Sequence, residues 1–130
     1  MTDLQSAEGT IVISHGKDGI IRVIGRGFWS EKTVRAYFKE VGRLITQYRS
    51  IDTSVRMLID VADGAVQSST TTARLNAALS GMQCPGDRIA IVARSTLVKL
   101  QSERIGKDLE NHRTFRSTAE AEAWLSDRES

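Results

Sequence analysis

The 130-residue sequence has few residues of several types, and each shortage excludes a class of protein. One cysteine, Cys84, excludes an internal disulfide, and with only two histidines no cluster has the spacing of a metal site. Aromatic residues are 5% of the chain, too few for a base-stacking surface. No apolar run approaches the roughly twenty residues of a membrane helix. We therefore expect neither a nucleic-acid partner nor integral membrane association.

The rest of the composition is typical of one globular domain. Hydrophobic residues make up 40% of the chain and charged residues 26%, which indicates a folded rather than a disordered protein. Eighteen basic and sixteen acidic residues leave a net charge of +2, a small surplus for attracting phosphate backbones. The polar N-terminus lacks the pattern of a secretory signal. We predict a cytoplasmic protein with a single domain over residues 1–130 and disorder over residues 1–8.

Five segments have the composition of β-strands. Two β-branched runs at residues 10–14 and 20–26 are separated by a glycine-bearing turn, which predicts an antiparallel hairpin. The apolar runs at residues 54–61 and 88–93 are typical of strands covered on both faces, and a short strand is expected at residues 112–115.

Between these strands the hydrophobic residues recur at helical spacing. Ser30 is expected to cap a long first helix, Ser68 or Ser69 to begin the second, Ser95 to cap the third, and Ser117 to open the fourth with a capping box. The order is β-β-α-β-α-β-α-β-α. It predicts an α/β fold in which an N-terminal antiparallel hairpin leads into a mostly parallel sheet flanked by four helices.

Several segments within the span from about residue 20 to residue 125 match those of a known family. They are Gly27-Phe28-Trp29-Ser30, Leu58-Ile59-Asp60-Val61, Asp87-Arg88-Ile89-Ala90-Ile91-Val92, Ser95-Thr96-Leu97-Val98, Phe115 and Glu120-Ala121-Glu122-Ala123-Trp124-Leu125. In these segments the chain resembles the SpoIIAA-like (STAS/SEC14-type) family of small bacterial α/β domains. The resemblance implies a regulatory module that docks on another protein. Its SEC14-type side implies the alternative, a carrier of a small apolar or lipid-like ligand with Met82, Leu97 and Val98 along its cavity.

The resemblance also implies a phosphorylated serine at the start of the second helix, because related anti-sigma factor antagonists carry one in an Asp-Ser-Ser-Gly-like setting. Here Ser68 or Ser69 stands at that start, but Asp63 is not adjacent to them and no glycine follows. A phosphate there would meet free amides and the positive end of the helix dipole. In the alternative interpretation the serine only caps the helix, with residues 70–72 in solvent.

The remaining candidates follow the carboxyl ends of the predicted parallel strands, where open α/β sheets bind ligands. Asp60 and Asp63 flank the end of one strand, and Trp29, Arg94 and Ser95 are expected nearby as a ligand crevice. Asp60 has no histidine or thiol beside it in the sequence, so the aspartates are expected to accept hydrogen bonds from loop amides.

We therefore predict no catalytic residue, no cofactor and no metal, and a protein that is not an enzyme. The partner-binding surface is expected at Asp60, Asp63, Ser68 and Ser69, where phosphorylation of a serine or threonine would switch binding. A homodimer through the edge hairpin or a helix face is left open.

Overall fold

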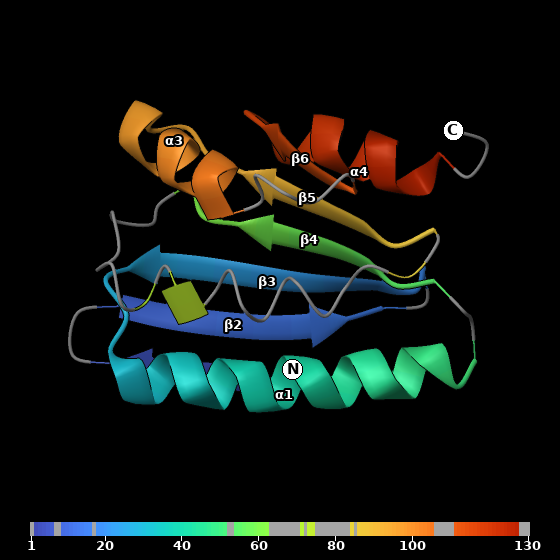
Figure 1. Ribbon diagram of the computed structural model, residues 1–130, viewed down its shortest axis with the longest axis horizontal. Helices are drawn as coiled ribbons and strands as arrows, with labels where there is room; N and C mark the ends of the chain where they lie inside the picture. The colour runs from blue at the N-terminus through green and yellow to red at the C-terminus, as the bar shows by residue number, and fades with distance from the viewer. Residues whose placement is uncertain are drawn as a thin grey trace.

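The computed structural model describes residues 2–6, 9–16, 18–51, 54–62, 71, 73–74, 84, 86–105 and 111–127. These residues form one six-stranded sheet in the order β1-β2-β3-β4-β5-β6 (Figure 1). The first three strands pair antiparallel and the strands from β3 onward pair parallel, so the predicted change from hairpin to parallel sheet is confirmed. The strands are β1 (Thr2–Ser6), β2 (Gly9–His15), β3 (Ile20–Gly27), β4 (Arg56–Asp60), β5 (Arg88–Val92) and β6 (His112–Phe115).

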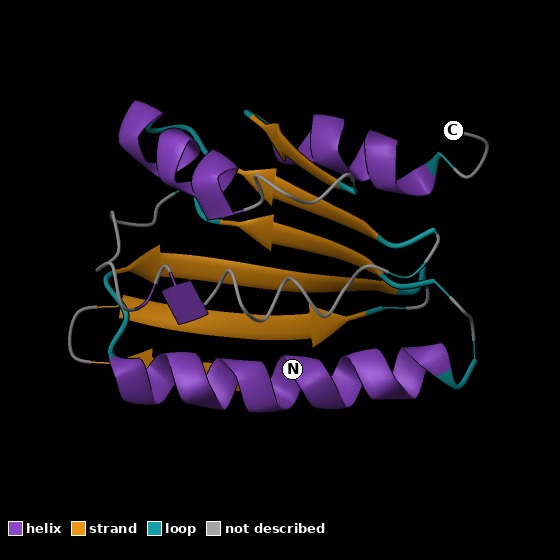
Figure 2. Cartoon of the chain, in the orientation of Figure 1, coloured by secondary structure: helices purple, strands orange, loops and turns teal. Residues whose placement is uncertain are grey.

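The described residues include three helices longer than one turn, α1 (Glu31–Arg49), α3 (Thr96–Ile105) and α4 (Thr118–Ser126) (Figure 2). Four helices are expected from the sequence. Thr71, Ala73 and Arg74 are helical and belong to the predicted second helix, most of which lies outside the described residues. None of the described helices is both long and apolar enough to cross a bilayer.

The two faces of the sheet bury separate hydrophobic clusters because successive side chains of a strand point to opposite faces. The face covered by α1 includes Ile21 and Val23 of β3, with Val34 and Leu44 of the helix packed on them. On the other face, α4 packs against β4, β5 and β6, and its Leu125 lies among side chains of those strands. In Figure 1 the two helices lie at opposite edges of the sheet, α1 beside β2 and α4 beside β6.

The expectation of disorder over residues 1–8 is wrong for Thr2–Ser6, which form the edge strand β1. Leu4 pairs with Ile11 of β2 and packs on the core from its partly buried position. Leu4 is the only apolar residue of this strand, so its sequence lacks the alternation that predicts a strand. Residues 2–6 form a strand because they pair with β2, and not because of their own sequence pattern.

The predicted helix caps at Ser30, Ser95 and Ser117 are confirmed, and the start expected at Ser68 or Ser69 lies outside the described residues. The Oγ atom of Ser30 accepts a hydrogen bond from the amide of Thr33 at 3.2 Å, and the Oγ atom of Ser117 accepts one from Glu120 at 3.2 Å. Ser95 caps α3 more loosely, since its Oγ lies 3.4 Å from the amide of Val98. Each bond satisfies an amide that the first turn of a helix would leave unpaired.

Asp87, which directly precedes β5, holds together the amino end of the parallel strands. Its side chain is fully buried, and its carboxylate accepts bonds from Arg49 at 3.1 and 2.6 Å. It also accepts from the amides of Val55 at 2.7 Å and Cys84 at 3.2 Å. One carboxylate thus joins the end of α1 to the segments that enter β4 and β5.

Two arginines on adjacent strands fasten the C-terminal end of α4 to the same end of the sheet. Arg56 and Arg88 are paired in register as the first residues of β4 and β5. Arg56 donates to the carbonyl of Leu125 at 2.8 Å, and Arg88 donates to that of Trp124 at 2.5 Å. These bonds satisfy carbonyls of the last helical turn, which have no partner within the helix.

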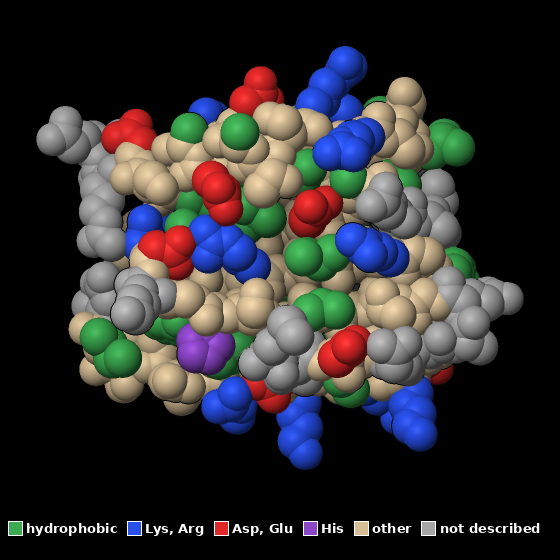
Figure 3. Space-filling view, turned by 180° about the vertical axis from the view of Figure 1, so that it is seen from behind, with side chains coloured by type: hydrophobic (Ala, Val, Ile, Leu, Met, Phe, Trp, Pro, Cys, Tyr) green, Lys and Arg blue, Asp and Glu red, His purple; other side chains and the backbone are tan. Residues whose placement is uncertain are grey.

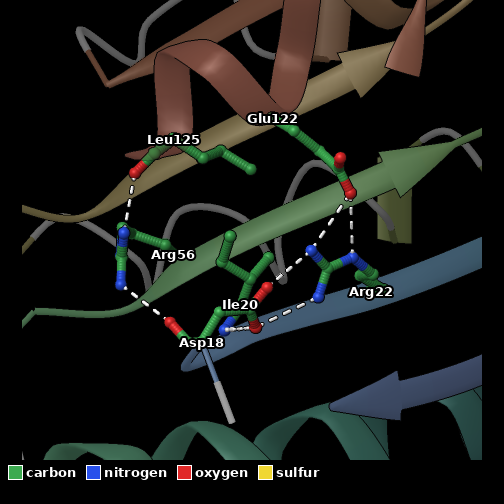
Figure 4. Close-up of polar contacts among 6 residues, drawn as sticks. All are labelled: Asp18, Ile20, Arg22, Arg56, Glu122 and Leu125. Carbon is green, nitrogen blue, oxygen red and sulfur yellow. Dashed lines mark hydrogen bonds and ion pairs between the residues drawn. The ribbon is translucent and has the colours of Figure 1, made fainter. Parts of the chain in front are cut away.

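Arg22 of β3 adds an ion-pair network beside Arg56 (Figure 4). Its guanidinium donates to both carboxylate oxygens of Asp18, at 3.1 and 2.7 Å, and to Glu122 of α4 at 3.0 Å. The bonds from Arg22 hold the pKa of Asp18 below its usual value. All of these contacts lie at the amino end of the parallel strands, away from the end where function is expected.

Candidate functional site

Asp60 lies where the sequence analysis expects it, as the last residue of β4. It pairs in register with Ile24 of β3 on one side and Val92 of β5 on the other. Its Oδ1 atom accepts a hydrogen bond from the amide of Ala62 at 3.0 Å. The carboxylate is therefore engaged in forming the turn after the strand, as expected for an aspartate that accepts from a loop amide.

Trp29 is part of the core instead of lining a crevice, since only 6% of it is exposed. Its indole N–H donates to the carbonyls of Thr10, at 3.2 Å, and Arg26, at 3.1 Å. The ring covers Gly25 so closely that a Cβ built there would lie 2.2 Å from the indole Cζ2. Trp29 fixes the junction between β3 and α1, and offers a ligand little surface.

Arg94 and Ser95 are exposed in the short segment between β5 and α3. The hydroxyl of Ser95 serves the helix cap already described. These two residues share the carboxyl end of the sheet with Asp60, whereas Trp29 lies beneath that surface. Of the four candidate site residues that the structure describes, three are polar residues at the surface and the fourth, Trp29, is buried in the core.

Large apolar side chains are exposed at this end of the sheet. Of the five large hydrophobic residues that the described part of the chain leaves exposed, four lie here, and we call them the carboxyl-end surface: Ile24, Phe28, Leu97 and Leu100. Ile24 and Phe28 come from β3 and the segment after it, and the two leucines from the start of α3. Leu97 is 65% exposed, whereas its neighbour Val98 is buried.

This exposure overturns part of the sequence interpretation of α3. Leu97 and Val98 are both expected along the cavity of a ligand carrier, but the structure exposes one and buries the other. Residues three apart share one side of a helix, so Leu97 and Leu100 form the outer apolar pair. The sequence alone could have indicated this exposure. Leu97, Val98 and Leu100 are spread too widely around a helix for all three side chains to lie on one narrow buried stripe.

Three predicted site residues, Asp63, Ser68 and Ser69, lie outside the described residues. Thr71 of the same hydroxyl run is described and is buried, with 4% exposed, although the capping interpretation expects it in solvent. Of the residues predicted to form the phosphorylation or partner-binding surface, the structure therefore describes only Asp60. The role of Ser68 and Ser69 stays a prediction.

The polar groups described elsewhere do not converge on this end of the sheet. No group of three or more His, Cys, Asp or Glu side chains among the described residues could hold a metal ion. His15 bonds through Nδ1 to the hydroxyl of Tyr48 at 3.0 Å. His112 lies in β6, and burial lowers its pKa. What the described site offers is apolar contact area beside hydrogen-bonding groups.

Comparison with known proteins supports the fold. No protein-family model matches the chain, and no curated protein matches it significantly. A solved structure of an anti-sigma factor antagonist from Mycobacterium paratuberculosis superposes with a TM-score of 0.71 at 17% identity, covering 95% of this chain and 100% of that one. An uncharacterised DUF3478-family protein from Shewanella loihica PV-4, which has a SpoIIAA-like fold, superposes with a TM-score of 0.64 at 14% identity, covering 94% and 98%. The chain is thus a single α/β domain with the SpoIIAA-like (STAS) fold.

Proposed function

We propose that the chain is a non-enzymatic regulatory module that acts by binding another protein through the carboxyl-end surface. The observation that carries this proposal is the exposure of four large hydrophobic side chains at one end of the sheet. Apolar side chains gathered at one end of a domain are typical of a site that a partner covers.

The energetics favour contact through the two leucines of α3. Leu97 is 65% exposed and Leu100 is 48% exposed, so most of one side chain and half of the other remain to be buried. Complete burial of a leucine side chain is worth about 1.5–3 kcal/mol. Arg94 and Asp60 lie at the same end and supply the polar margin that protein interfaces commonly have.

The fold supports the choice of partner to test first. One protein of the same fold is an anti-sigma factor antagonist. An anti-sigma factor of the host organism is accordingly the first class of partner we propose. Binding to such a partner requires exposed complementary surface and no chemical step, which agrees with a site made of apolar contacts and hydrogen-bonding groups.

The test uses the double variant Leu97→Glu/Leu100→Glu and the control Ile51→Glu. Ile51, which is 78% exposed, follows α1 at the opposite end of the sheet. Isothermal titration calorimetry against the host's anti-sigma factors is expected to show binding by the wild type and by the control. The double variant is expected to bind at least about tenfold more weakly, since it loses two apolar contacts. Equal affinity of the double variant and the wild type would refute the proposed surface.

We also propose that phosphorylation at Ser68 or Ser69 switches this binding. The support is the hydroxyl run at the start of the second predicted helix and the proximity of that segment in sequence to Asp60. A phosphate would change the charge that a partner meets. Ser68→Asp and Ser69→Asp, each compared with the corresponding alanine variant, are expected to change the partner's dissociation constant. If all four variants bind like the wild type, the switch is wrong and the docking proposal is unaffected.

A further inference from the structure

The outer face of α1 carries a line of basic side chains that the proposed function does not use. Lys32, Arg35, Lys39 and Arg43, which we call the basic stripe, are all exposed. Steps of three and four residues keep them on one side of the helix. They span about 16 Å at 1.5 Å per residue. In Figure 3, Lys and Arg side chains project from the lower edge of the molecule, along which α1 runs in Figure 1.

The chain balances this charge only in part. Arg35 lies 3.5 Å from Glu31 and Arg43 lies 2.5 Å from Glu40, both as exposed pairs within the helix. Such pairs are weak and leave their arginines able to turn to another partner. Lys32 and Lys39 form no ion pair with any residue that the structure describes. The two ammonium groups are seven residues apart, which places them about 10 Å from each other along the helix.

A glycine in the same helix provides a second, independent observation. Gly42 lies within the 19-residue helix α1 and is exposed. A Cβ built on it would meet no atom of the described chain within 4 Å. Glycine inside a helix costs stability relative to alanine, because it loses more backbone conformational entropy on folding. Packing within the described chain gives no reason for that cost, whereas close approach of another backbone to α1 would give one.

The shape of α1 selects among anionic partners. Its apolar side is buried in the core through Val34, Tyr37, Val41 and Leu44, so nothing apolar remains to insert into a bilayer. Four basic residues diluted by two glutamates are also at the lower limit for electrostatic membrane binding. The exposed side presents no aromatic ring on which nucleic-acid bases could stack. A protein surface with carboxylates at helical spacing fits these observations best.

We propose that the basic stripe docks an acidic helix of a protein partner, with a small residue of that helix against Gly42. Carboxylates seven residues apart on the partner would face Lys32 and Lys39. The inference rests on the proposed protein-binding function and assigns it a second contact, which is separate from the carboxyl-end surface. This second contact is expected to orient the partner and to raise the association rate more than it raises the affinity, because its charges are exposed and screened by salt.

The probe is a synthetic 21-residue helical peptide with glutamates spaced by three, four and seven residues, and its glutamine counterpart is the control peptide. At low ionic strength the wild type is expected to bind the glutamate peptide at least about tenfold more tightly than the glutamine peptide. Lys32→Glu/Lys39→Glu should remove that difference. Lys99→Glu/Arg116→Glu, which makes the same change in net charge elsewhere, should bind the glutamate peptide within about twofold of the wild type.

Gly42→Leu supplies a second arm that tests close approach. It is expected to weaken peptide binding at least about fivefold without lowering the melting temperature, because leucine favours helix more than glycine does. Equal losses in the two charge-reversal variants, or unchanged binding by Gly42→Leu, would overturn the proposal. It would also be overturned if vesicles with 30% anionic lipid, or a 20-base-pair duplex, bound more tightly than the peptide through Lys32 and Lys39.

The two proposals fail separately. Leu97→Glu/Leu100→Glu should still bind the acidic peptide, because its changes lie on α3 and not on α1. If that variant no longer binds an anti-sigma factor that the wild type binds, and the wild type does not bind the peptide, then only the proposal for the basic stripe is wrong. If the peptide binds as described and no anti-sigma factor binds, the choice of partner is wrong.

Discussion

The two ends of the parallel sheet differ in what their side chains do. At the amino end, buried or partly buried charges bond to the backbone: Asp87 joins two strand entries to α1, and Arg56 and Arg88 hold the end of α4. At the carboxyl end, the described polar groups make local turns and caps, and apolar side chains such as Leu97 are in solvent. The charges of one end stabilise the fold, whereas the other end leaves apolar surface in solvent.

This division has a physical reason. Charged anchors must be paired in the folded state to offset the cost of removing them from water, so residues that hold the fold cannot also be offered to a partner. Exposed apolar residues cost the free domain little and gain contact area on binding. A domain that places the two kinds of residue at opposite ends can change its binding surface with little effect on its stability.

The largest effect is expected from removing the anchor of the amino end. Asp87→Ala removes the buried carboxylate that accepts from Arg49 and from the amides of Val55 and Cys84, so the free energy of unfolding should fall by about 3–5 kcal/mol in urea titrations. Asp18→Ala is the matched control, because its ion pair with Arg22 is exposed and should cost about 1 kcal/mol or less. Similar losses in the two variants would remove the distinction between a buried anchor and a surface pair.

A smaller loss is expected from the apolar anchor beneath the carboxyl end. Gly25→Ala places a methyl group against the indole of Trp29, and the strain should lower the free energy of unfolding by about 1–3 kcal/mol. Gly42→Ala has open space around its new methyl group and should instead stabilise the chain by about 0.5–1 kcal/mol. Thermal and urea unfolding check both variants, and a neutral Gly25→Ala would contradict the close packing at Trp29.

The smallest effect is a dependence of stability on pH through His112. Burial lowers its pKa in the folded chain, with Glu103 opposing the shift, and its Nε2 atom has no hydrogen-bond partner within the described residues. Below the ordinary histidine pKa the unfolded chain takes up a proton that the folded chain resists. The free energy of unfolding should therefore fall as the pH drops from 7.5 to 5.5.

One histidine variant separates this effect from other titrations. His112→Gln should reduce the fall in stability, because it removes the buried imidazole. Urea titrations at several pH values give the comparison. An identical pH dependence in His112→Gln and the wild type would assign the effect to other groups.

Local chemistry made much of the fold predictable. The strands at β2 to β6 and the caps at Ser30, Ser95 and Ser117 follow from neighbouring residues, and the structure has them where the patterns indicate. The bond from Arg49 to Asp87 joins residues 38 positions apart, and no local pattern contains it. Strand β1 is missed for the same reason, because its register with β2 and not its own composition makes it a strand.

The candidate site was predictable in position but not in composition. Asp60, Arg94 and Ser95 lie at the carboxyl end because the alternation of strands and helices determines where strands end. Leu97 and Val98 are adjacent apolar residues, and only the docking of α3 decides which of them turns inward. Trp29 shows the converse, since its position at the strand end conceals a ring buried under the junction.

Hydrogen–deuterium exchange on a complex with an anti-sigma factor, the proposed class of partner, tests the division between the two ends most directly. The account predicts new protection in peptides covering residues 24–29 and 94–101, and unchanged exchange in those covering 49–58 and 86–89. Protection confined to the amino-end peptides, with the carboxyl-end peptides exchanging as in the free chain, would contradict it.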